Sequence, residues 1–265
     1  MPRAAPPGGL PRALAKRALE QVLWARVRVQ GLVEGRRAAP RPRPAPLPPG
    51  DVLSTRAERE AALTECRRLR LPSHHDRQKN WDALGALSVV LDAVPPDGRV
   101  LDAGAARYSP VLPWLRLYGY SRLVGNNLEF TRRTRHGPVT FEHGDITATD
   151  YPDASFDAVT CLSVIEHGVP VEPFLKESAR ILRTGGVLVV STDYDRDPPD
   201  TTGKQAYGVP VHIFSPHEIR ELVDLAAGHG LRLRGELRLD NAERPVHWAR
   251  TGLDYTCIRL TFDRD

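Results

Sequence analysis

Two adjacent side chains that can exchange protons, Glu166 and His167, follow the apolar run 156–162. Such a run is typical of a buried strand, and residues just after a parallel strand lie at the ligand-binding edge of its sheet. A neutral imidazole there can remove a proton from a bound substrate. We therefore take His167 as the candidate general base and Glu166 as its catalytic neighbour. Ordering of the loop or contact with a cofactor is the alternative for both.

A second stretch with ligand-binding character is VLDAGAARYSP at 100–110. Its apolar beginning predicts a strand, and Gly104 permits a backbone conformation that side chains disfavour. Ser109 is a candidate N-cap, and Pro110 suits the first position of a helix. A strand, a tight turn and a helix N-terminus leave unpaired amides that can face a polar ligand.

Strands and helices alternate along the chain after this loop. The apolar runs predict the strands, and prolines, glycines and polar residues bound them. The alternation predicts an α/β fold with a doubly wound, mainly parallel sheet and ligands at the carboxyl ends of its strands. The expected strands after the first are 121–125, 139–142, 156–162 and 187–190, and the expected helices are 109–117 and 172–182.

The part of the chain after 190 combines a polar segment with a strand pair. Residues 191–210 contain four aspartates and predict a long loop that acts as a lid or substrate loop. Tyr194, Asp193 and His212 are the candidates for contacting the substrate. The alternative is that they are ordinary polar side chains with a surface or structural role. The alternating segments 231–239 and 255–262 predict two antiparallel strands.

Two helices are expected ahead of the first core strand. Thr55 and Glu58 have the spacing of a capping box, and a second apolar face runs from 80 to 93. Helices at this place can cover a ligand cleft. His74, His75 and Lys79 lie between the two helices, where we expect ordinary linker side chains, with ligand binding as the alternative.

Composition predicts a globular protein with a full-sized core, because 41% of the 265 residues are hydrophobic. The three cysteines are far apart and form no metal-binding spacing, which predicts a reducing compartment. The sequence contains no apolar run long enough to span a bilayer and no secretory signal. We therefore expect a cytoplasmic protein with no membrane span.

Positive charge is concentrated at the N-terminal end. Residues 1–50 carry ten Lys or Arg against two Glu, so the other residues have a net charge of −4. We divide the chain into a basic amphipathic arm with a Pro-rich linker (1–50), a helical cap (51–98) and a ligand-binding domain (99–265). The arm could dock on an acidic partner, a membrane or a nucleic acid, or pack on the body or a second subunit. The acidic body argues against a nucleic-acid groove.

Residues from about 80 to 263 resemble the class I S-adenosylmethionine-dependent methyltransferases, particularly the bacterial branch that acts on small molecules. Four motifs in order carry the resemblance: VLDAGAARYSP, LVGNNLE, HGDI with the following YPDASFDAVTCLSVIEHGV, and ILRTGGVLVVSTDY. The resemblance implies a Rossmann-like sheet of seven strands with an N-terminal helical extension, and S-adenosyl-L-methionine as cofactor. The cofactor-binding residues that it implies are Asp102, Gly104, Ala105, Asn127, Asp145, Ile146 and Ser163.

Each part of the cofactor has its own expected contacts. In the family, the acidic residue and glycine of the first loop hold the amino acid end, which here are Asp102 and Gly104. The end of the second strand holds the ribose, and the acidic residue after the third strand holds the adenine, which corresponds to Asp145 beside Ile146.

The sequence departs from the family pattern in two motifs. Ala106 and Tyr108 stand where the first loop usually has glycines, so Tyr108 must point away from the pocket or line it. Asn127 stands where a carboxylate usually binds the ribose, and an amide lacks that charge. Weaker or altered cofactor binding follows, with Glu129 as a possible substitute. A dinucleotide dehydrogenase is disfavoured, because residues 104–109 lack two of the three fingerprint glycines.

No metal is expected. Some methyltransferases of this type bind a divalent ion through a Glu-x-x-Glu-His arrangement, but here Ser163 takes the place of the first glutamate. A metal needs several converging ligands, and the sequence shows no complete set.

The sequence thus predicts methyl transfer from S-adenosylmethionine to a small molecule, a sugar or a secondary metabolite, at oxygen. The alternative is a cofactor-binding protein that does not methylate and acts as a partner or scaffold. An RNA methyltransferase is disfavoured by the acidic body. Association of copies through the N-terminal arm is a further possibility.

Overall fold

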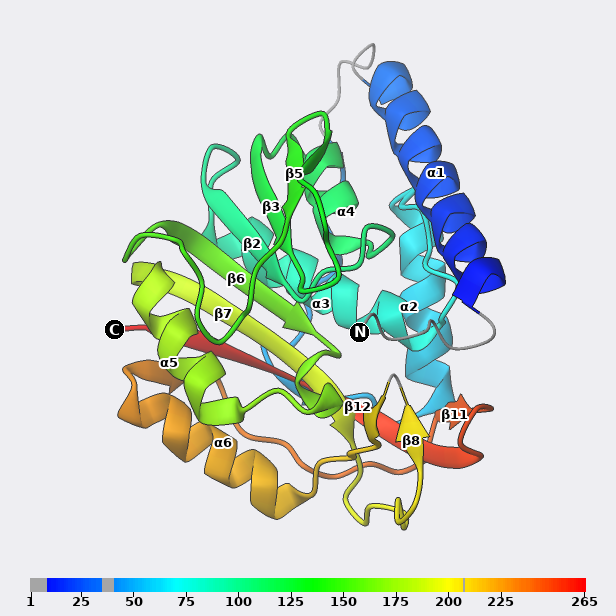
Figure 1. Cartoon of the computed structure of the whole chain (residues 1–265), viewed down its shortest axis with the longest axis vertical. Helices are drawn as coiled ribbons and strands as arrows, with labels where there is room; N and C mark the ends of the chain where they lie inside the picture. Colours follow the sequence, from blue (N-terminus) through cyan, green and yellow to red (C-terminus); the bar gives the residue numbers. More distant parts are fainter. Residues whose placement is uncertain (1–8, 35–40, 207) are drawn as a thin grey trace, which may run out of the picture.

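The computed structural model describes residues 9–34, 41–206 and 208–265. Figure 1 shows a central sheet with helices on both sides and one long helix, α1 (Gly9–Glu34), at the edge of the molecule. One hydrophobic core joins α2, α3 and α4 to the sheet, and a second joins α5 and α6 to it. The predicted α/β class is therefore confirmed.

Five parallel strands form the centre of the sheet. Their order is β5-β3-β2-β6-β7, and β12 (Leu253–Arg264) adds antiparallel to β7. Because the chain moves from β2 to β3 and β5 on one side and then to β6 and β7 on the other, the topological switch point lies between β2 and β6. The central strands are β2 (Arg99–Ala103), β3 (Arg122–Asn126), β5 (Val139–Glu142), β6 (Phe156–Leu162) and β7 (Leu182–Tyr194).

Short strands enlarge the expected seven-stranded sheet to ten strands. β10 (Leu231–Leu233) pairs antiparallel with β12, which confirms the expected C-terminal strand pair in a shorter form. The other short strands of this sheet are β1 (Asp51–Val52), β4 (Thr134–His136) and β11 (Val246–Trp248), and a separate hairpin contains β8 (Gln205–Ala206) and β9 (Val209–Pro210).

Helices α2 and α6 begin at side-chain caps that the sequence offers. Thr55 accepts a hydrogen bond from the Glu58 amide, and Ser215 and Glu218 form a complete capping box. Ser109 is not the expected N-cap, because its Oγ accepts the Ala106 amide 3.1 Å away inside the loop. The helices are α2 (Arg56–Arg68), α3 (Gln78–Ala93), α4 (Val111–Leu117), α5 (Val171–Ile181) and α6 (Pro216–Gly228), with a 3-10 turn η1 at Ile165–His167.

Helix α3 lies directly on the sheet and is part of the main core. A Cβ at Gly85 would lie 2.0 Å from the guanidinium carbon of Arg259 on β12, so only glycine permits this approach. Arg259 is almost fully buried and donates to the Pro48 carbonyl at 2.9 Å. The segment that we named the helical cap thus packs on the sheet through α3.

Strand β7 extends farther than its sequence pattern indicated. We expected a loop from residue 191, but β7 continues to Tyr194 and pairs with β12 along its length. Residues 191–194 alternate between the two faces of the sheet while their polar groups are buried. The loop prediction failed because polar residues in sequence are typical of loops, whereas here they lie on a strand that is buried on both faces.

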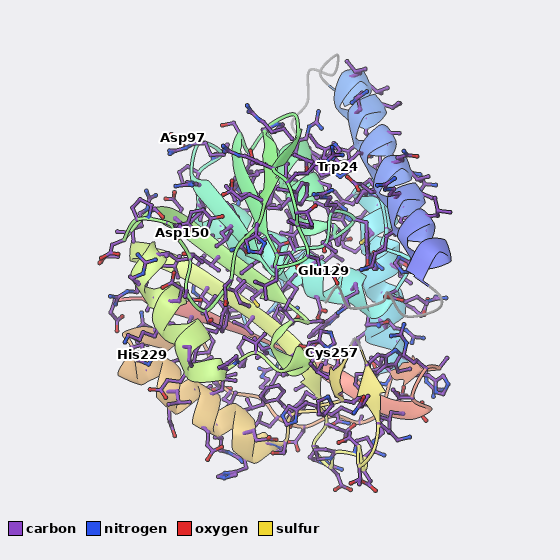
Figure 2. All side chains as sticks on the ribbon, in the orientation of Figure 1. Trp24, Asp97, Glu129, Asp150, His229 and Cys257 are labelled. Carbon is purple, nitrogen blue, oxygen red and sulfur yellow. The ribbon has the colours of Figure 1, made fainter. Side chains whose placement is uncertain are left out.

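The N-terminal helix packs on the body, which was one of the alternatives for the arm. Its residues Leu23, Trp24 and Val27 are buried, and Figure 2 shows Trp24 between α1 and the sheet. Residues 1–8 and 35–40 of the arm lie outside the described residues. Among the described residues, no helix is both long and apolar enough to cross a bilayer. The three cysteines, Cys66, Cys161 and Cys257, are buried free thiols.

Candidate active site

The loop after β2 is held tightly at the switch point. Gly104 has φ +74°, and a Cβ there would lie 2.6 Å from a methyl carbon of Val164, which follows β6. The Gly104 amide donates to Asn126 Oδ1 at 3.4 Å. Only glycine can adopt this backbone conformation and fit into this space. The close approach shows that the loops after β2 and β6 are in contact at the switch point, where an α/β sheet binds its ligand.

Asp102 is a buried carboxylate at the end of β2. It is 3% exposed and accepts a hydrogen bond from Thr160 Oγ1 at 2.7 Å. Burial raises its pKa to about 7, although the Thr160 bond opposes the shift. A cationic ligand group at Asp102 would stabilise its charged form.

Asn127, which directly follows the neighbouring strand β3, holds the loop after β2 in place. Its Nδ2 donates to the carbonyls of Gly104 and Ala105, each at 3.1 Å, and its Oδ1 accepts the Glu129 amide at 2.8 Å. A carboxylate could not donate to these two carbonyls. The departure from the family pattern therefore has a local structural reason, while Glu129 is exposed and pairs with Lys16 of α1 at 3.1 Å.

The ends of β3 and β5 supply further polar groups beside this loop. The Nδ2 of Asn126 is buried without a hydrogen-bond partner, and a Cβ at Gly144 would lie 2.9 Å from it. Asp145 is exposed and its Oδ1 accepts both the amide and the hydroxyl of Thr147, while Ile146 is buried. An unpaired buried donor and an exposed carboxylate thus lie along one edge of the sheet, where a ligand could use both.

A group of charged side chains occupies the other side of the switch point. Lys79 and Asp82 come from the first turns of α3, Glu166 from η1 and Asp193 from β7. Burial disfavours the Lys79 ammonium, but the carboxylates of Asp82, Glu166 and Asp193 raise its pKa above the usual value. Ser163 connects the two sides, because it precedes Val164 and donates to Asp82 Oδ2 at 3.2 Å. We call Lys79, Asp82, Glu166 and Asp193 the charged cluster.

Glu166 and His167 differ in protonation and exposure. Burial and then Asp193 raise the pKa of Glu166 to about 8, opposed by Lys79, and its Oε2 accepts Thr192 Oγ1 at 3.1 Å. Burial and Lys79 lower the pKa of His167 to about 4. At neutral pH, Glu166 is therefore mostly an acid and His167 a neutral base. The His167 side chain is 35% exposed against 2% for Glu166, with Nε2 and Oε1 4.0 Å apart.

Sequence reasoning missed two members of this region, Asp82 and Tyr255. Burial raises the pKa of Asp193 to about 6, while Lys79 and a hydrogen bond to Tyr255 oppose the shift. Tyr255 is almost fully buried on β12. The only signal for Asp82 was an acidic residue three positions after Lys79 in an otherwise apolar helix. Nothing in the sequence connected Tyr255 with Asp193.

Two of the three predicted acceptor contacts lie elsewhere. Tyr194 follows Asp193 along β7 and therefore faces the opposite side of the sheet, where it is fully buried and donates to the Leu239 carbonyl. The structure thus places Tyr194 in that core, and its role as an acceptor contact stays a prediction. His212 pairs with Glu218 at 3.1 Å and packs on Phe214 at the start of α6, outside the charged cluster.

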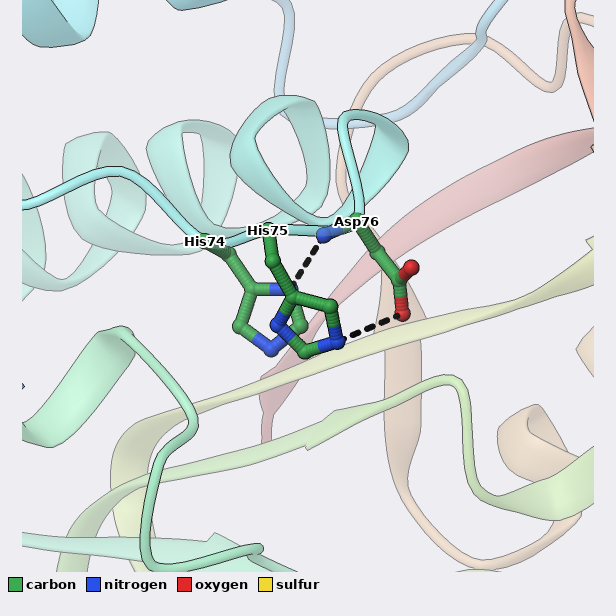
Figure 3. Close-up of side chains that lie close together, drawn as sticks. All are labelled: His74, His75 and Asp76. Atoms are coloured by element: carbon green, nitrogen blue, oxygen red, sulfur yellow. Dashed lines mark hydrogen bonds and ion pairs between the residues drawn. The ribbon is translucent and has the colours of Figure 1, made fainter. Parts of the chain in front are cut away.

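His74, His75 and Asp76 form a compact group on the linker before α3 (Figure 3), and their ligand atoms lie within 4.8 Å of one another. However, His74 Nδ1 accepts the Asp76 amide at 3.1 Å, so the neutral ring carries its proton on Nε2. A metal-binding imidazole normally donates from its second nitrogen instead. The linker histidines therefore do not form a prepared metal site. Tyr108 packs on His74, with ring centroids 5.8 Å apart.

The fold and the two sides of the switch point define an α/β protein with a candidate polar ligand site at the ends of β2, β3, β5, β6 and β7. Residues 101–190 match the family model described as a methyltransferase domain. A probable S-adenosylmethionine-dependent methyltransferase of Mycolicibacterium smegmatis is 34% identical over 107 residues, 40% of each chain. The chain therefore contains a methyltransferase domain and is similar to S-adenosylmethionine-dependent methyltransferases.

Other known proteins share parts of the chain or its fold. A sterol 24-C-methyltransferase of Yarrowia lipolytica is 28% identical over 178 residues, which cover 60% of this chain and 46% of that protein. The matches thus span less than half of these curated relatives. The geranyl diphosphate C-methyltransferase of Streptomyces coelicolor A3(2), solved with Mg2+, geranyl diphosphate and S-adenosyl-L-homocysteine, has a TM-score of 0.55 at 16% identity. The alignment covers 93% of this chain and 98% of that one.

The domain match and the named relatives support the predicted methyltransferase class with S-adenosylmethionine as cofactor. The residues of this chain fit that cofactor. Buried Asp102 offers a carboxylate for its ammonium group, and the unpaired Asn126 amide and exposed Asp145 offer polar partners farther along the edge. Gly104 leaves space that any side chain would fill.

Proposed function

We propose that this chain methylates a hydroxyl oxygen of a small molecule, a sugar or secondary metabolite, with S-adenosylmethionine as the methyl donor. The observation that supports this proposal is the position of the charged cluster. It lies directly across Val164 and Ser163 from the loop of Gly104. An acceptor in this place would meet ionisable groups on one side and the cofactor loop on the other.

Residues on the β2 side would bind the cofactor. Asp102 and Gly104 hold its amino acid end, and Asp145 with Ile146 contacts the adenine. Asn127 contributes by keeping the carbonyls of Gly104 and Ala105 in place, because its amide is fully used in that contact. When bound, the cofactor supplies an electrophilic methyl group, whose old bond to sulfur breaks with the electron pair left on sulfur as the acceptor oxygen forms the new bond.

His167 is the general base in this proposal. Its ring is neutral at pH 7 because its pKa is lowered by burial and Lys79. It is also the more exposed member of its pair, so an acceptor can reach it without moving the core. His167 takes the hydroxyl proton as the new bond forms, and buried Glu166 positions the ring from behind.

Carbon methylation is a second candidate, favoured by the carboxylates of the charged cluster. Transfer of a methyl cation to an alkene carbon leaves a carbocation, which these carboxylates could stabilise before a proton is lost to His167. The sterol and geranyl diphosphate relatives are named as C-methyltransferases. Hydroxyl acceptors and isolated alkenes therefore belong in the same activity screen.

The test combines an acceptor screen with a base variant. The full chain is incubated with S-adenosylmethionine and separate panels of sugars, phenols and prenyl alkenes, and S-adenosylhomocysteine formation is measured by mass spectrometry. We expect turnover with hydroxyl acceptors, and His167→Ala to lower kcat by about 10² to 10⁴-fold without loss of cofactor binding. His217→Ala, an exposed histidine on α6, is the control and should keep full activity.

Turnover within a few-fold of wild type in His167→Ala would contradict the role of His167 as base. Turnover with the alkenes only would replace oxygen by carbon as the acceptor atom. Cofactor binding without turnover on every panel would favour a scaffold instead of an enzyme.

A further inference from the structure

Helix α1 has two apolar faces, and only one is covered. On the inner face, Leu23, Trp24 and Val27 are buried against the body, and Trp24 Nε1 donates to the Arg107 carbonyl at 2.9 Å. Lys16 and Glu20 add bonds to Glu129 and His136. These contacts fix the orientation of the helix relative to the cofactor loop.

The outer face of α1 carries a second apolar stripe. Val22, Val29 and Leu32 follow one another at intervals of seven and three, so they share a side of the helix opposite Leu23 and Val27. Val29 is 61% and Leu32 68% exposed. The complete stripe consists of Leu14, Val22, Val29, Leu32 and Val33, with Ala18 and Ala25 between them.

Positive charge borders this stripe on both sides. Arg17 and Arg28 lie along one flank and Arg26 along the other, and all three are exposed. The only acidic residue of α1 whose side chain is described is Glu20, which is turned inward to His136 at 3.0 Å. An apolar stripe between arginines, with no exposed acid among the side chains of α1 that the structure describes, is the pattern of a helix that lies in a membrane interface.

We propose that the outer face of α1 binds the surface of an anionic lipid bilayer, with the apolar stripe in the interface and the arginines on the headgroups. Charge complementarity selects this occupant. A second copy would place arginine flanks against each other, and a nucleic acid would leave the stripe without an apolar partner. The helix lies at the edge of the molecule, where a flat surface can reach it (Figure 1).

Binding would hold the cofactor loop close to the bilayer, because Trp24 connects α1 to Arg107 in that loop. This inference does not depend on the acceptor or on His167. It concerns where the protein works, whereas the proposed function concerns what it methylates.

The test is co-sedimentation of the full chain with vesicles of equal parts phosphatidylcholine and phosphatidylglycerol, compared with phosphatidylcholine alone. We expect binding to the anionic vesicles only. The Val29→Asp, Leu32→Asp double variant should bind at least about ten-fold more weakly. Replacing Arg17, Arg26 and Arg28 with Gln should weaken binding by about five-fold for each arginine. Leu225→Asp, a substitution of an exposed leucine on α6, is the matched control.

Thermal unfolding of each variant checks that the inner contacts of α1 persist. Absence of wild-type binding to the anionic vesicles would overturn the proposal, as would equal binding by wild type and the double variant. Equal binding to neutral vesicles would overturn the role of the arginines. A wild-type dimer that the double variant dissociates would make a second copy the occupant instead.

Discussion

The two sides of the switch point use different interactions to build one site. On the side of β2 and β3, hydrogen bonds of amide groups shape the site, since the side chains of Asn126 and Asn127 hold the Gly104 loop. On the side of β6 and β7, the charged cluster places the half-buried Lys79 ammonium beside three buried carboxyl groups. The first side is shaped to hold one rigid ligand, whereas the second can adjust its protonation to the group that it meets.

The largest effect should come from the charged cluster. Lys79→Met removes the cation that faces three buried carboxyl groups, so we expect the free energy of unfolding to fall by about 2 to 3 kcal/mol. Turnover should be lost while S-adenosylhomocysteine binding on the other side changes little. Urea unfolding and calorimetric titration measure the two quantities. The control is Lys176→Met, an exposed lysine on α5, and equal stability of both variants would contradict the importance of Lys79.

A smaller loss of stability should accompany a change at the cofactor loop. Gly104→Ala forces a side chain onto Val164 at φ +74°, so we expect a loss of about 1 to 3 kcal/mol and cofactor binding weakened more than about ten-fold. Gly185→Ala is the matched control, because Gly185 has φ +77° with no atom within 4 Å of its added Cβ. Calorimetry with S-adenosylhomocysteine compares them. The same affinity in both variants would mean that backbone strain, not crowding at the switch point, matters.

The smallest effect is a pH dependence that belongs to the charged cluster. Folded Glu166 keeps its proton up to a pKa of about 8, whereas the unfolded chain releases it near 4.5, so this group makes stability fall as pH rises between these values. His167 acts in the opposite direction between about 4 and 6.5, because its folded pKa is lowered. Asp102 lowers stability in the same way up to its own pKa of about 7, so the clear window for Glu166 is pH 7 to 8.

In that window, wild type should lose up to about 1.4 kcal/mol per pH unit relative to Glu166→Gln. Urea unfolding at several pH values measures the slopes. Glu236→Gln, a change at an exposed glutamate, should keep the wild-type slope. If Glu166→Gln also keeps the wild-type slope, Glu166 is ionised in the folded protein, and its pKa is not raised as we expect.

The contrast between the two sides also explains what the sequence could predict. The bounds of β5 and β6 are those expected, and the Gly104 turn was recognised, because each depends on consecutive residues. The charged cluster joins positions 79, 82, 166 and 193, and nothing local reports that they meet. Residues 191–194 were expected in a loop for a related reason: a strand buried on both faces can carry polar residues when neighbouring strands and helices satisfy them.

The role of Asn127 lies between these cases. The sequence identified the position and the missing carboxylate, but not that both carbonyls of the adjacent loop use its amide. The outer stripe of α1 was likewise visible only as an amphipathic pattern. Its inner and outer faces could be separated only once Leu23 and Val27 were seen to be buried and Val29 and Leu32 exposed.

The central claim is that the switch point binds the methyl-donor cofactor, and titration calorimetry of the full chain with S-adenosylhomocysteine tests it most directly. We predict one site per chain, with binding that weakens in Gly104→Ala and persists in Gly185→Ala. No binding by the wild-type chain at millimolar ligand would contradict the account.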